Sequence, residues 1–396
     1  MQNNPVRLHH IDLLRGLIII FMIIDHAMVY CSDYFVNDPM DIPGTDPKIF
    51  FSRFISHFCA PLFIFLAGLS ASLTENRFSN PHDFAKNLML RGLVLILLEF
   101  TIISWSWSFN PTFPMLYAQV IWGIGWGFLF LGLLRLVGIK CVFIIGTMIV
   151  LGHNLLDNIR FQDNTWMHYL WSVLHQKNVL ALPFDFKIRT TYPVLPIIGL
   201  MCVAYMAGRY YASQQVSQQF VKKADKQALV TGILCLLSYA ILRGFNLYGD
   251  AGQFTAQDSA VLTLMSFFNP TKYPLSLQFM LLTVGTGLIL LFCFKQLKAT
   301  FSEGFLQVLG KTSMFSYIAH LYLLHIISWL LIPVLGFQWS DMTYGETLIG
   351  LPEGFGLSYG ATYIFAFTVV LLTTLLAKQY IPWKYANKHN SIARYI

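Results

Sequence analysis

The sequence predicts an all-α, polytopic membrane protein: a bundle of about ten transmembrane helices. Hydrophobic residues make up 56% of the 396-residue chain and charged residues only 11%, whereas a soluble domain carries about 25% charged residues. The apolar residues also gather into runs of roughly 20, which is the length that crosses the hydrocarbon core of a bilayer. We therefore expect one membrane domain, 1–396, that is surrounded by membrane lipid and ends in a short cytoplasmic tail, 388–396.

Ten apolar segments can be recognised along the chain. Several of them contain Gly or Pro, which membrane helices tolerate because neighbouring groups satisfy the freed backbone. The predicted spans are 11–31, 50–73, 88–108, 117–136, 141–156, 191–211, 228–246, 274–294, 312–335 and 357–378.

The basic residues predict the orientation of these spans. With the N-terminus in the cytoplasm, 17 Lys and Arg residues fall on the cytoplasmic side and 7 on the outer side, while Arg15 and Arg53 lie inside spans. Basic residues are enriched in cytoplasmic loops of membrane proteins. Both termini are therefore predicted to be cytoplasmic, and 157–190 is predicted to be an outer loop.

Charge, motif spacing and glycine placement exclude several function classes. The net charge of +7 is spread over short loops, so we expect no nucleic-acid partner. No HExxH pattern and no Cys/His pair at ligand spacing occurs, so we expect no metal. The glycine run Gly123, Gly125 and Gly127 lies within a span and follows no strand. It therefore indicates close helix packing rather than nucleotide binding.

The first span, 11–31, carries an unusual set of ionisable residues. Asp12, Arg15, Asp25 and His26 all lie within it, although a charge at membrane depth costs roughly 2.5–3.5 kcal/mol on insertion scales. Arg15 and His26 are about 16 Å apart along a helix with a rise of about 1.5 Å per residue. Arg15 suits an anion on the inner side, and His26 suits proton transfer on the outer side. Asp25 points about 100° away from His26 on a helix and is expected to pair elsewhere.

Other polar residues are predicted to reach the same outer layer as His26. Arg53 and His57 are spaced i, i+4 in the second span and should share a helix face. Polar residues inside a membrane bundle pair with one another or line a cavity, and we expect a cavity that binds the substrate. The remaining members of this layer are His153, Asn154, Asp157, Arg243, Asn246, Lys272 and Tyr273.

These residue types match the needs of acyl transfer. A base must remove a proton from the acceptor, and donors must stabilise the tetrahedral oxyanion. His26 or His57 is the candidate base, and Arg53 or Asn154 is the candidate donor. Asp25 and Asp157 are the candidate orienting carboxylates. On the inner side, Arg15, Arg91 and Arg209 are candidates for binding the phosphates of coenzyme A, although Arg91 and Arg209 are also typical topology anchors.

Several stretches resemble a known family. The opening RLHHIDLLRG, the Asp25-His26 pair, HFCAPLFIFLAGLSASL, LGHNLLD, LRGFNLYGD and TKYPLSLQFMLLTVG resemble bacterial membrane proteins related to heparan-alpha-glucosaminide N-acetyltransferase. The resemblance runs from Arg7 to about His320. The spacing from Arg15 to His26 also resembles the arginine-x10-histidine pattern of the transmembrane acyltransferases of bacterial surface glycans.

The resemblance implies a multi-pass acyltransferase of the bacterial cytoplasmic (inner) membrane. Such an enzyme moves an acyl group, usually acetyl, from cytoplasmic acetyl-CoA or another acyl-CoA to an amine or hydroxyl of a glycan or small envelope molecule outside. The family's catalytic histidine lies in the first non-cytoplasmic loop, but the corresponding stretch here, Ser32–Ile49, contains no histidine. Another residue must then act as the base, or the activity has been lost.

Two other classes of function fit the sequence. A transporter or flippase for a polar or acidic solute also places ionisable residues in the membrane, but the chain shows no inverted repeat. A non-catalytic membrane scaffold would instead close the outer polar residues into ion pairs. The acceptor, the acyl chain and a homo-oligomeric state are left open by the sequence.

The predicted orientation can be tested by labelling. A cysteine introduced in 157–190 should react with an impermeant thiol reagent in intact cells, whereas one introduced in 213–226 should not, because only the first loop lies outside. The reverse labelling pattern would contradict both cytoplasmic termini.

Overall fold

The structure is a computed structural model, and ten long apolar helices dominate it. In the part of the chain that is described, these ten helices are long and apolar enough to cross a membrane, and each overlaps one predicted span. The fold class is therefore confirmed. The predicted tail, 388–396, lies outside the described residues. The described residues are 8–34, 39–42, 44–110, 115–183, 186–214, 218–297, 304–343 and 349–387.

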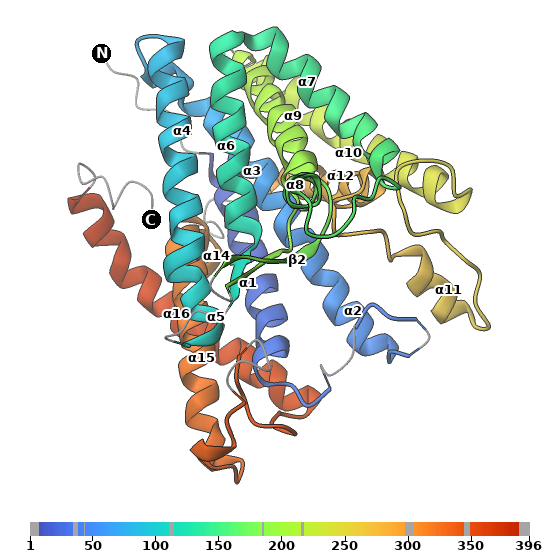
Figure 1. The fold of residues 1–396 in the computed structure, drawn as a ribbon. Coiled ribbons are helices and arrows are strands. Elements are labelled where there is room, and N and C mark those ends of the chain that lie inside the picture. The colour runs from blue at the N-terminus through green and yellow to red at the C-terminus, as the bar shows by residue number, and fades with distance from the viewer. Residues whose placement is uncertain are drawn as a thin grey trace. The chain divides into compact units, whose positions relative to one another are not determined.

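The chain divides into two compact units, each assembled from separate stretches of sequence. Figure 1 labels the helices and strands of the chain and colours them by residue number. Unit 1 comprises Met1–His10, Ala60–Glu99 and Tyr117–Gln296, and unit 2 comprises Ile11–Cys59, Phe100–Leu116 and Leu297–Ile396. The single membrane domain predicted from the sequence stays a prediction.

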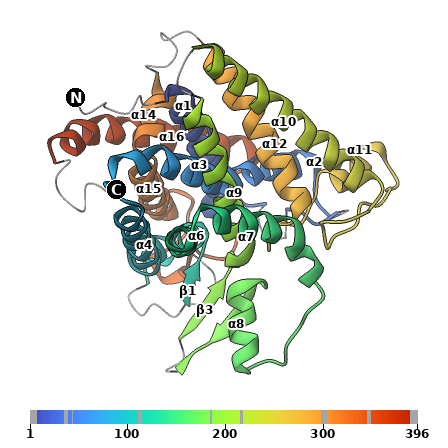
Figure 2. The ribbon, with the colours of Figure 1, turned by 90° about the horizontal axis from the view of Figure 1, so that it is seen from above.

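Unit 1 is built mainly from long helices, with a small sheet and two short helices between them (Figure 2). Its elements are α3 (Cys59–Thr74), η2 (Glu75–Arg77), α4 (Pro81–Leu98), β1 (Met115–Ala118), α6 (Val120–Val137), α7 (Ile139–Gly152), η4 (His153–Leu156), α8 (Trp166–Leu174), β2 (Asn178–Ala181), β3 (Lys187–Thr190), α9 (Val194–Ser213), α10 (Gln218–Gly244), α11 (Ala260–Phe267) and α12 (Leu277–Gln296).

Glycines bring α6 into close contact with both α4 and α9. A Cβ atom on Gly125 would lie 2.8 Å from the carbonyl oxygen of Gly92 in α4. On the other side, a Cβ atom on Gly123 would lie 2.4 Å from Cδ1 of Ile197 in α9, and Gly127 meets α9 in the same way. The glycine run is thus a packing surface, as predicted, because small residues let helix backbones approach closely in a membrane.

Two strands that follow the helix α8 join β1 in a three-stranded sheet of order β1-β3-β2. β2 and β3 are antiparallel, with Asn178 opposite Thr190 and Ala181 opposite Lys187. β2 and β3 belong to the connection between α7 and α9, which is the predicted outer loop, whereas β1 precedes α6. This connection is therefore folded, and it holds His175 in a defined place just after α8.

Unit 2 contains the first helix of the chain and the last ones. Its elements are α1 (His9–Cys31), α2 (Pro47–Ile55), η1 (Ser56–Phe58), the π-helical η3 (Glu99–Ile103), α5 (Ser104–Ser108), α14 (Phe305–Lys311), α15 (Ser313–Val334), η6 (Trp339–Asp341) and α16 (Tyr359–Ala386). Glycine again sets the closest approach, because a Cβ atom on Gly16 of α1 would lie 1.9 Å from the carbonyl oxygen of Leu306 in α14.

The second span is broken at His57, which corrects the expected i, i+4 relation of Arg53 and His57. Arg53 belongs to α2, which ends at Ile55, and His57 lies in the 3-10 turn η1 before α3 begins. Pro61 explains the break, because a proline ring clashes with the carbonyl group four residues earlier and offers no N–H to it. That carbonyl group belongs to His57. The two side chains therefore do not share one continuous α-helical face.

The α4–α6 contact predicts a stability effect. Gly125→Ala should lower the free energy of unfolding by about 1–3 kcal/mol, because the added methyl group meets the backbone of α4. The thermal stability of the detergent-solubilised variant measures this effect. Gly360→Ala is the matched control, since no described atom outside the local backbone of its own helix and its two chain neighbours lies within 4 Å of the added methyl group. Equal stability of the two variants would contradict the packing.

Candidate functional site

A pair of histidines joins α1 to α15 within unit 2. Nδ1 of His26 lies 2.9 Å from Nε2 of His320, and Nδ1 of His320 lies 2.9 Å from the carbonyl oxygen of Ser316. The two imidazole rings are stacked, with centroids 5.1 Å apart. We call His26, His320 and the Ser316 carbonyl group the histidine relay.

The hydrogen bonds of the histidine relay define which nitrogens carry hydrogen. A carbonyl oxygen only accepts, so Nδ1 of His320 must donate to Ser316. His320 is 0% exposed, and a buried charge is costly, so its ring is neutral and Nε2 is an acceptor. Nδ1 of His26 therefore donates to His320. In neutral His26 the lone pair that can take a proton then lies on Nε2.

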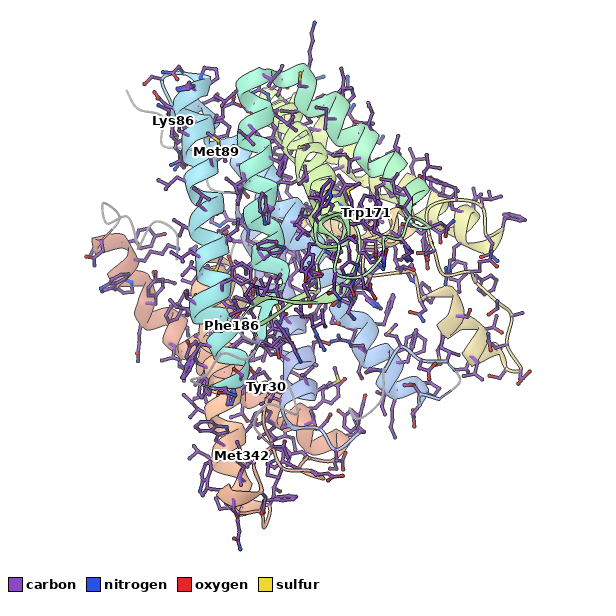
Figure 3. All side chains as sticks on the ribbon, in the orientation of Figure 1. Tyr30, Lys86, Met89, Trp171, Phe186 and Met342 are labelled. Carbon is purple, nitrogen blue, oxygen red and sulfur yellow. The ribbon has the colours of Figure 1, made fainter. Side chains whose placement is uncertain are left out.

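Aromatic rings enclose this pair. Trp107 contacts His26 edge to face at a centroid distance of 4.9 Å, and it stacks on Tyr30, which is labelled in Figure 3. The Tyr30 hydroxyl donates to the carbonyl oxygen of Ser106, 2.8 Å away. Nδ1 of His325 lies 3.0 Å from the same carbonyl oxygen. These contacts fix the rings around His26 and tie α1 and α15 to α5.

Asp25 and Arg53 form an ion pair next to the histidine relay. The Arg53 guanidinium donates to Oδ1 of Asp25, and their side chains are 19% and 9% exposed. The expectation that Asp25 pairs away from its neighbour His26 is thereby confirmed. Because Asp25 precedes His26 directly, this ion pair holds the Arg53 guanidinium at nearly the same height along α1 as the histidine relay.

His57 is buried and packs against Phe54, with ring centroids 5.5 Å apart. The partner that the structure gives to His26 is His320. The shared cavity predicted for His26 and His57 stays a prediction.

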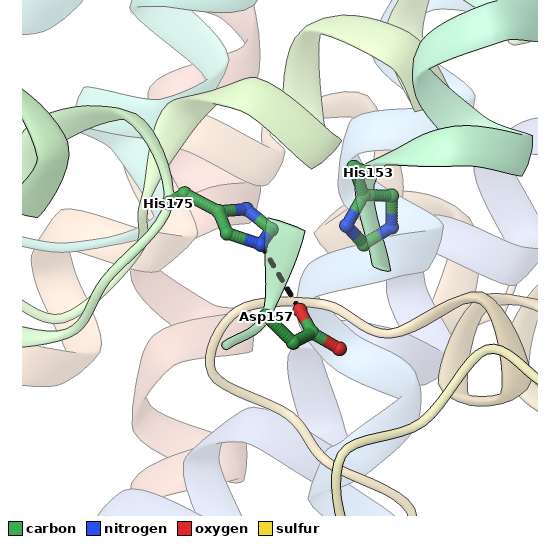
Figure 4. Close-up of side chains that lie close together, drawn as sticks. All are labelled: His153, Asp157 and His175. Atoms are coloured by element: carbon green, nitrogen blue, oxygen red, sulfur yellow. Dashed lines mark hydrogen bonds and ion pairs between the residues drawn. The ribbon is translucent and has the colours of Figure 1, made fainter. Parts of the chain in front are cut away.

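A second group of histidines lies in unit 1, where η4 and the residue after α8 meet (Figure 4). Nε2 of His175 lies 3.0 Å from Oδ1 of Asp157. His153 completes the group, with its ring centroid 5.5 Å from that of His175. We call these three residues the His-Asp-His cluster. His153 is the first residue of the 3-10 turn η4, and Asp157 directly follows the last residue of that turn.

Asn154 connects the His-Asp-His cluster to α12. Its side-chain amide donates to Oδ2 of Asp157 at 2.9 Å, and its carbonyl oxygen accepts from the backbone N–H of Leu277 at 3.0 Å. Burial tends to raise the pKa of the Asp157 carboxyl group, but hydrogen bonds from His175 and Asn154 outweigh burial and hold that pKa below its ordinary value. Asp157 is therefore a carboxylate at neutral pH.

Arg243 and Asn246 hold the long connection between α10 and α12. The Arg243 guanidinium is 2% exposed and donates to four backbone carbonyl oxygens, those of Gly252, Ser266, Phe267 and Asn269. The Asn246 amide exchanges two hydrogen bonds of 2.7 Å with the backbone of Phe254. These contacts are those of an architectural clamp, and the substrate-binding roles of both residues stay predictions.

Lys272 and Tyr273 belong to a cationic aromatic group before α12. The ammonium groups of Lys272 and Lys177 lie 5.4 and 5.1 Å from the centroid of the Tyr273 ring. The Tyr273 ring also meets Tyr192 edge to face, with centroids 4.9 Å apart. A cation over an aromatic face is attracted by the ring. The substrate-binding roles of Lys272 and Tyr273 stay predictions.

The three arginines proposed for coenzyme A have different surroundings. Arg15, in unit 2, lies 3.6 Å from Asp12, and its side chain is 21% exposed. In unit 1, Arg91 stacks over the Phe128 ring at 4.6 Å. Arg209 is ion-paired with the Glu75 carboxylate. Arg135 also binds the Glu75 carboxylate, at 2.8 Å, and the Tyr205 hydroxyl donates to it at 2.7 Å. Arg209 therefore belongs to an ion-pair network around Glu75.

Sequence reasoning did not assign two residues that the structure brings into these groups. His320 is the partner of His26, and its position in the middle of an apolar span was the signal for it. His175 lies 18 residues after Asp157, and no local motif marks it. Its location in a segment rich in tryptophan and histidine was the only hint.

The fold and the buried groups together define a class of protein: a multi-pass helical membrane protein with a histidine pair and an adjacent ion pair inside a helix bundle. Comparison with protein families makes the class specific. Residues 7–246 match the family described as heparan-alpha-glucosaminide N-acetyltransferase, catalytic. The chain therefore belongs to this family. The matched region includes α1, with the Asp25-His26 pair, and extends through α10. A search of curated proteins finds no significant match to the chain.

Proposed function

We propose that the protein is an integral membrane acyltransferase that uses acetyl-CoA or another acyl-CoA as donor. It passes the acyl group to an amine or hydroxyl of a glycan or small molecule of the cell envelope. The observation that carries the proposal is the histidine relay, in a chain that belongs to the heparan-alpha-glucosaminide N-acetyltransferase family. The proposed location is the bacterial inner membrane, with both termini in the cytoplasm.

His26 is the proposed base. Hydrogen bonding to His320 directs the lone pair of neutral His26 to Nε2, and Trp107 holds the ring from the side. Orientation of a base by a second hydrogen-bonding group is a common arrangement in acyl-transfer sites. His320 is thus a positioning residue, and the Ser316 carbonyl group positions His320 in turn.

Arg53 is the proposed donor to the oxyanion. Its guanidinium presents five N–H donors in a planar fork, and the ion pair with Asp25 fixes its direction beside the residue that precedes His26. A donor that is already in place stabilises developing negative charge without reorganisation. Asp25 therefore acts by positioning Arg53.

In the proposed transfer step, a proton and an acyl group move between the acceptor, His26 and the thioester. Nε2 of His26 takes the proton of the acceptor amine or hydroxyl while the acceptor atom forms a bond to the thioester carbonyl carbon. The carbonyl oxygen becomes an oxyanion beside Arg53, and the bond from carbon to sulfur then breaks. The coenzyme A thiolate leaves and receives the proton from His26, so neither an oxidant nor a metal enters the balance.

Arg15 is the proposed contact to a coenzyme A phosphate. It lies 11 residues before His26 on the same helix, which corresponds to about 16 Å along the axis. Its ion pair is with Asp12 of the same helix, whereas Arg209 of α9 is held by Glu75 of η2. An extended pantetheine arm would then run along α1 from Arg15 to His26.

The base assignment predicts a large kinetic effect. His26→Ala should lower the rate of acetyl transfer by about 10²–10⁴, because a positioned general base supplies roughly that factor. Acyl-CoA affinity should stay nearly constant, because His26 touches the reacting atoms and not the phosphates. Transfer from radiolabelled acetyl-CoA to a panel of envelope glycans, using detergent-solubilised protein, measures the rate.

His82→Ala, which alters an exposed histidine at the start of α4, is the control and should leave transfer unchanged. A near-normal rate in His26→Ala would remove His26 as the base, and the same test applied to His57 would then assign it. If the wild-type protein neither binds nor hydrolyses acyl-CoA, the enzyme is excluded and a transporter is favoured.

The donor assignment predicts a defect in binding. Arg15→Ala should weaken acyl-CoA binding while the protein stays folded, and Arg15→Lys should restore it only in part, because lysine lacks the bidentate geometry of arginine. Equilibrium binding of labelled acyl-CoA measures both variants. Unchanged affinity in Arg15→Ala would place the phosphates elsewhere.

A further inference from the structure

The His-Asp-His cluster has unused binding capacity. One ligand atom from each of His153, Asp157 and His175 can be chosen so that all three lie within 4.8 Å of one another. His153 is 2% exposed and His175 is 3% exposed. Among the described residues, neither ring nitrogen of His153 has a hydrogen-bond partner, and Nδ1 of His175 also lacks one. Buried polar groups are normally satisfied, so three such nitrogens at one point require an explanation.

The donor set matches one class of ligand. Two imidazoles and one carboxylate are the protein ligands of many catalytic zinc sites, in which water or substrate occupies the fourth position. Nε2 of His175 already lies 3.0 Å from Oδ1 of Asp157, and neutral imidazole is the form of histidine that binds metal. A cation held between these three groups would also satisfy one of the two ring nitrogens of His153 that have no hydrogen-bond partner among the described residues.

We propose that His153, Asp157 and His175 form a binding site for a divalent transition-metal cation, zinc(II) in particular. His153 begins the 3-10 turn that follows α7, Asp157 comes directly after that turn, and His175 comes directly after α8. They are held on two separate elements of unit 1, and they use none of the residues of the histidine relay.

The surrounding contacts position the ligands as a metal site requires. Asn154 donates to Oδ2 of Asp157, which leaves Oδ1 for the cation, and such supporting hydrogen bonds orient metal ligands. Trp171, labelled in Figure 3, fixes the backbone at His175. Its indole N–H donates to the carbonyl oxygen of Ile159 at 3.0 Å, and its backbone carbonyl oxygen accepts from the N–H of His175 at 2.7 Å.

To bind zinc, the three ligand atoms would have to move from their present separations, all within 4.8 Å, to those of a tetrahedral site. Ligand atoms at about 2.1 Å from a tetrahedral zinc ion are about 3.4 Å apart. Oδ1 of Asp157 and Nε2 of His175 are already 3.0 Å apart and would separate slightly as the cation replaces their hydrogen bond. His153 would have to approach them by rotation of its ring, and no hydrogen bond from that ring to a described residue opposes the rotation.

The experiment is zinc binding by the full-length protein in detergent. Protein stripped with a chelator is titrated with zinc(II) against a chromophoric competitor, and bound metal is counted by elemental analysis. We expect about one zinc per chain. His153→Ala and His175→Ala should each weaken binding by at least about tenfold, since even loss of a supporting hydrogen bond costs about 10–100-fold.

His168→Ala is the matched control. His168 is a buried histidine of α8 in the same connection, but it pairs with Asp163 at 3.3 Å and contacts Asn178. Its variant should bind zinc like the wild type. Should an alanine variant fail to fold, Asp157→Asn keeps the shape of the side chain and should still weaken zinc binding. Absence of stoichiometric zinc in the wild-type protein, or equal affinity in the His153 and His168 variants, would overturn the site.

Discussion

The hydrogen bond between His26 and His320 is the interaction on which the account of unit 2 depends. It connects a histidine of α1 to one that follows almost 300 residues later in the chain, and both lie within spans. In an apolar bundle each buried polar group needs a partner, because an unsatisfied one costs several kcal/mol. The bond therefore fixes the relative rotation of α1 and α15, and it also selects the nitrogen of His26 that is basic.

Close helix approach and buried polar groups support each other within each unit. Gly16 and Gly125 allow backbones to touch where a larger residue would collide. Under that constraint the polar groups pair with one another. Asp25 binds Arg53, Glu75 binds Arg135 and Arg209, and Asp157 binds His175. Ion pairing thus accounts for several of the charges that the sequence places at membrane depth. The histidines are the buried groups to which we assign proton transfer and metal binding.

The fold was predictable because composition and length alone identify membrane helices. The ten spans and the packing role of Gly125 follow from local sequence. The break at His57 was missed, although its cause, Pro61, is also local. The candidate site was predictable only in part. Asp25 and His26 are conspicuous in an apolar segment, but the partners His320 and Arg53 lie far along the chain. His175 carried no motif, because the connection that holds it folds through contacts between α8, β2 and β3 that local patterns do not encode.

The most direct test of the central claim is the tautomer of His26. Nitrogen-15 NMR of histidine-labelled protein, with His26 assigned by its loss in His26→Gln, distinguishes a hydrogen on Nδ1 from one on Nε2. The histidine relay predicts neutral His26 with hydrogen on Nδ1, and it predicts that this preference weakens in His320→Ala. Hydrogen on Nε2 in the wild-type protein, or a signal unaffected by His320→Ala, would contradict the claim that His320 orients the base.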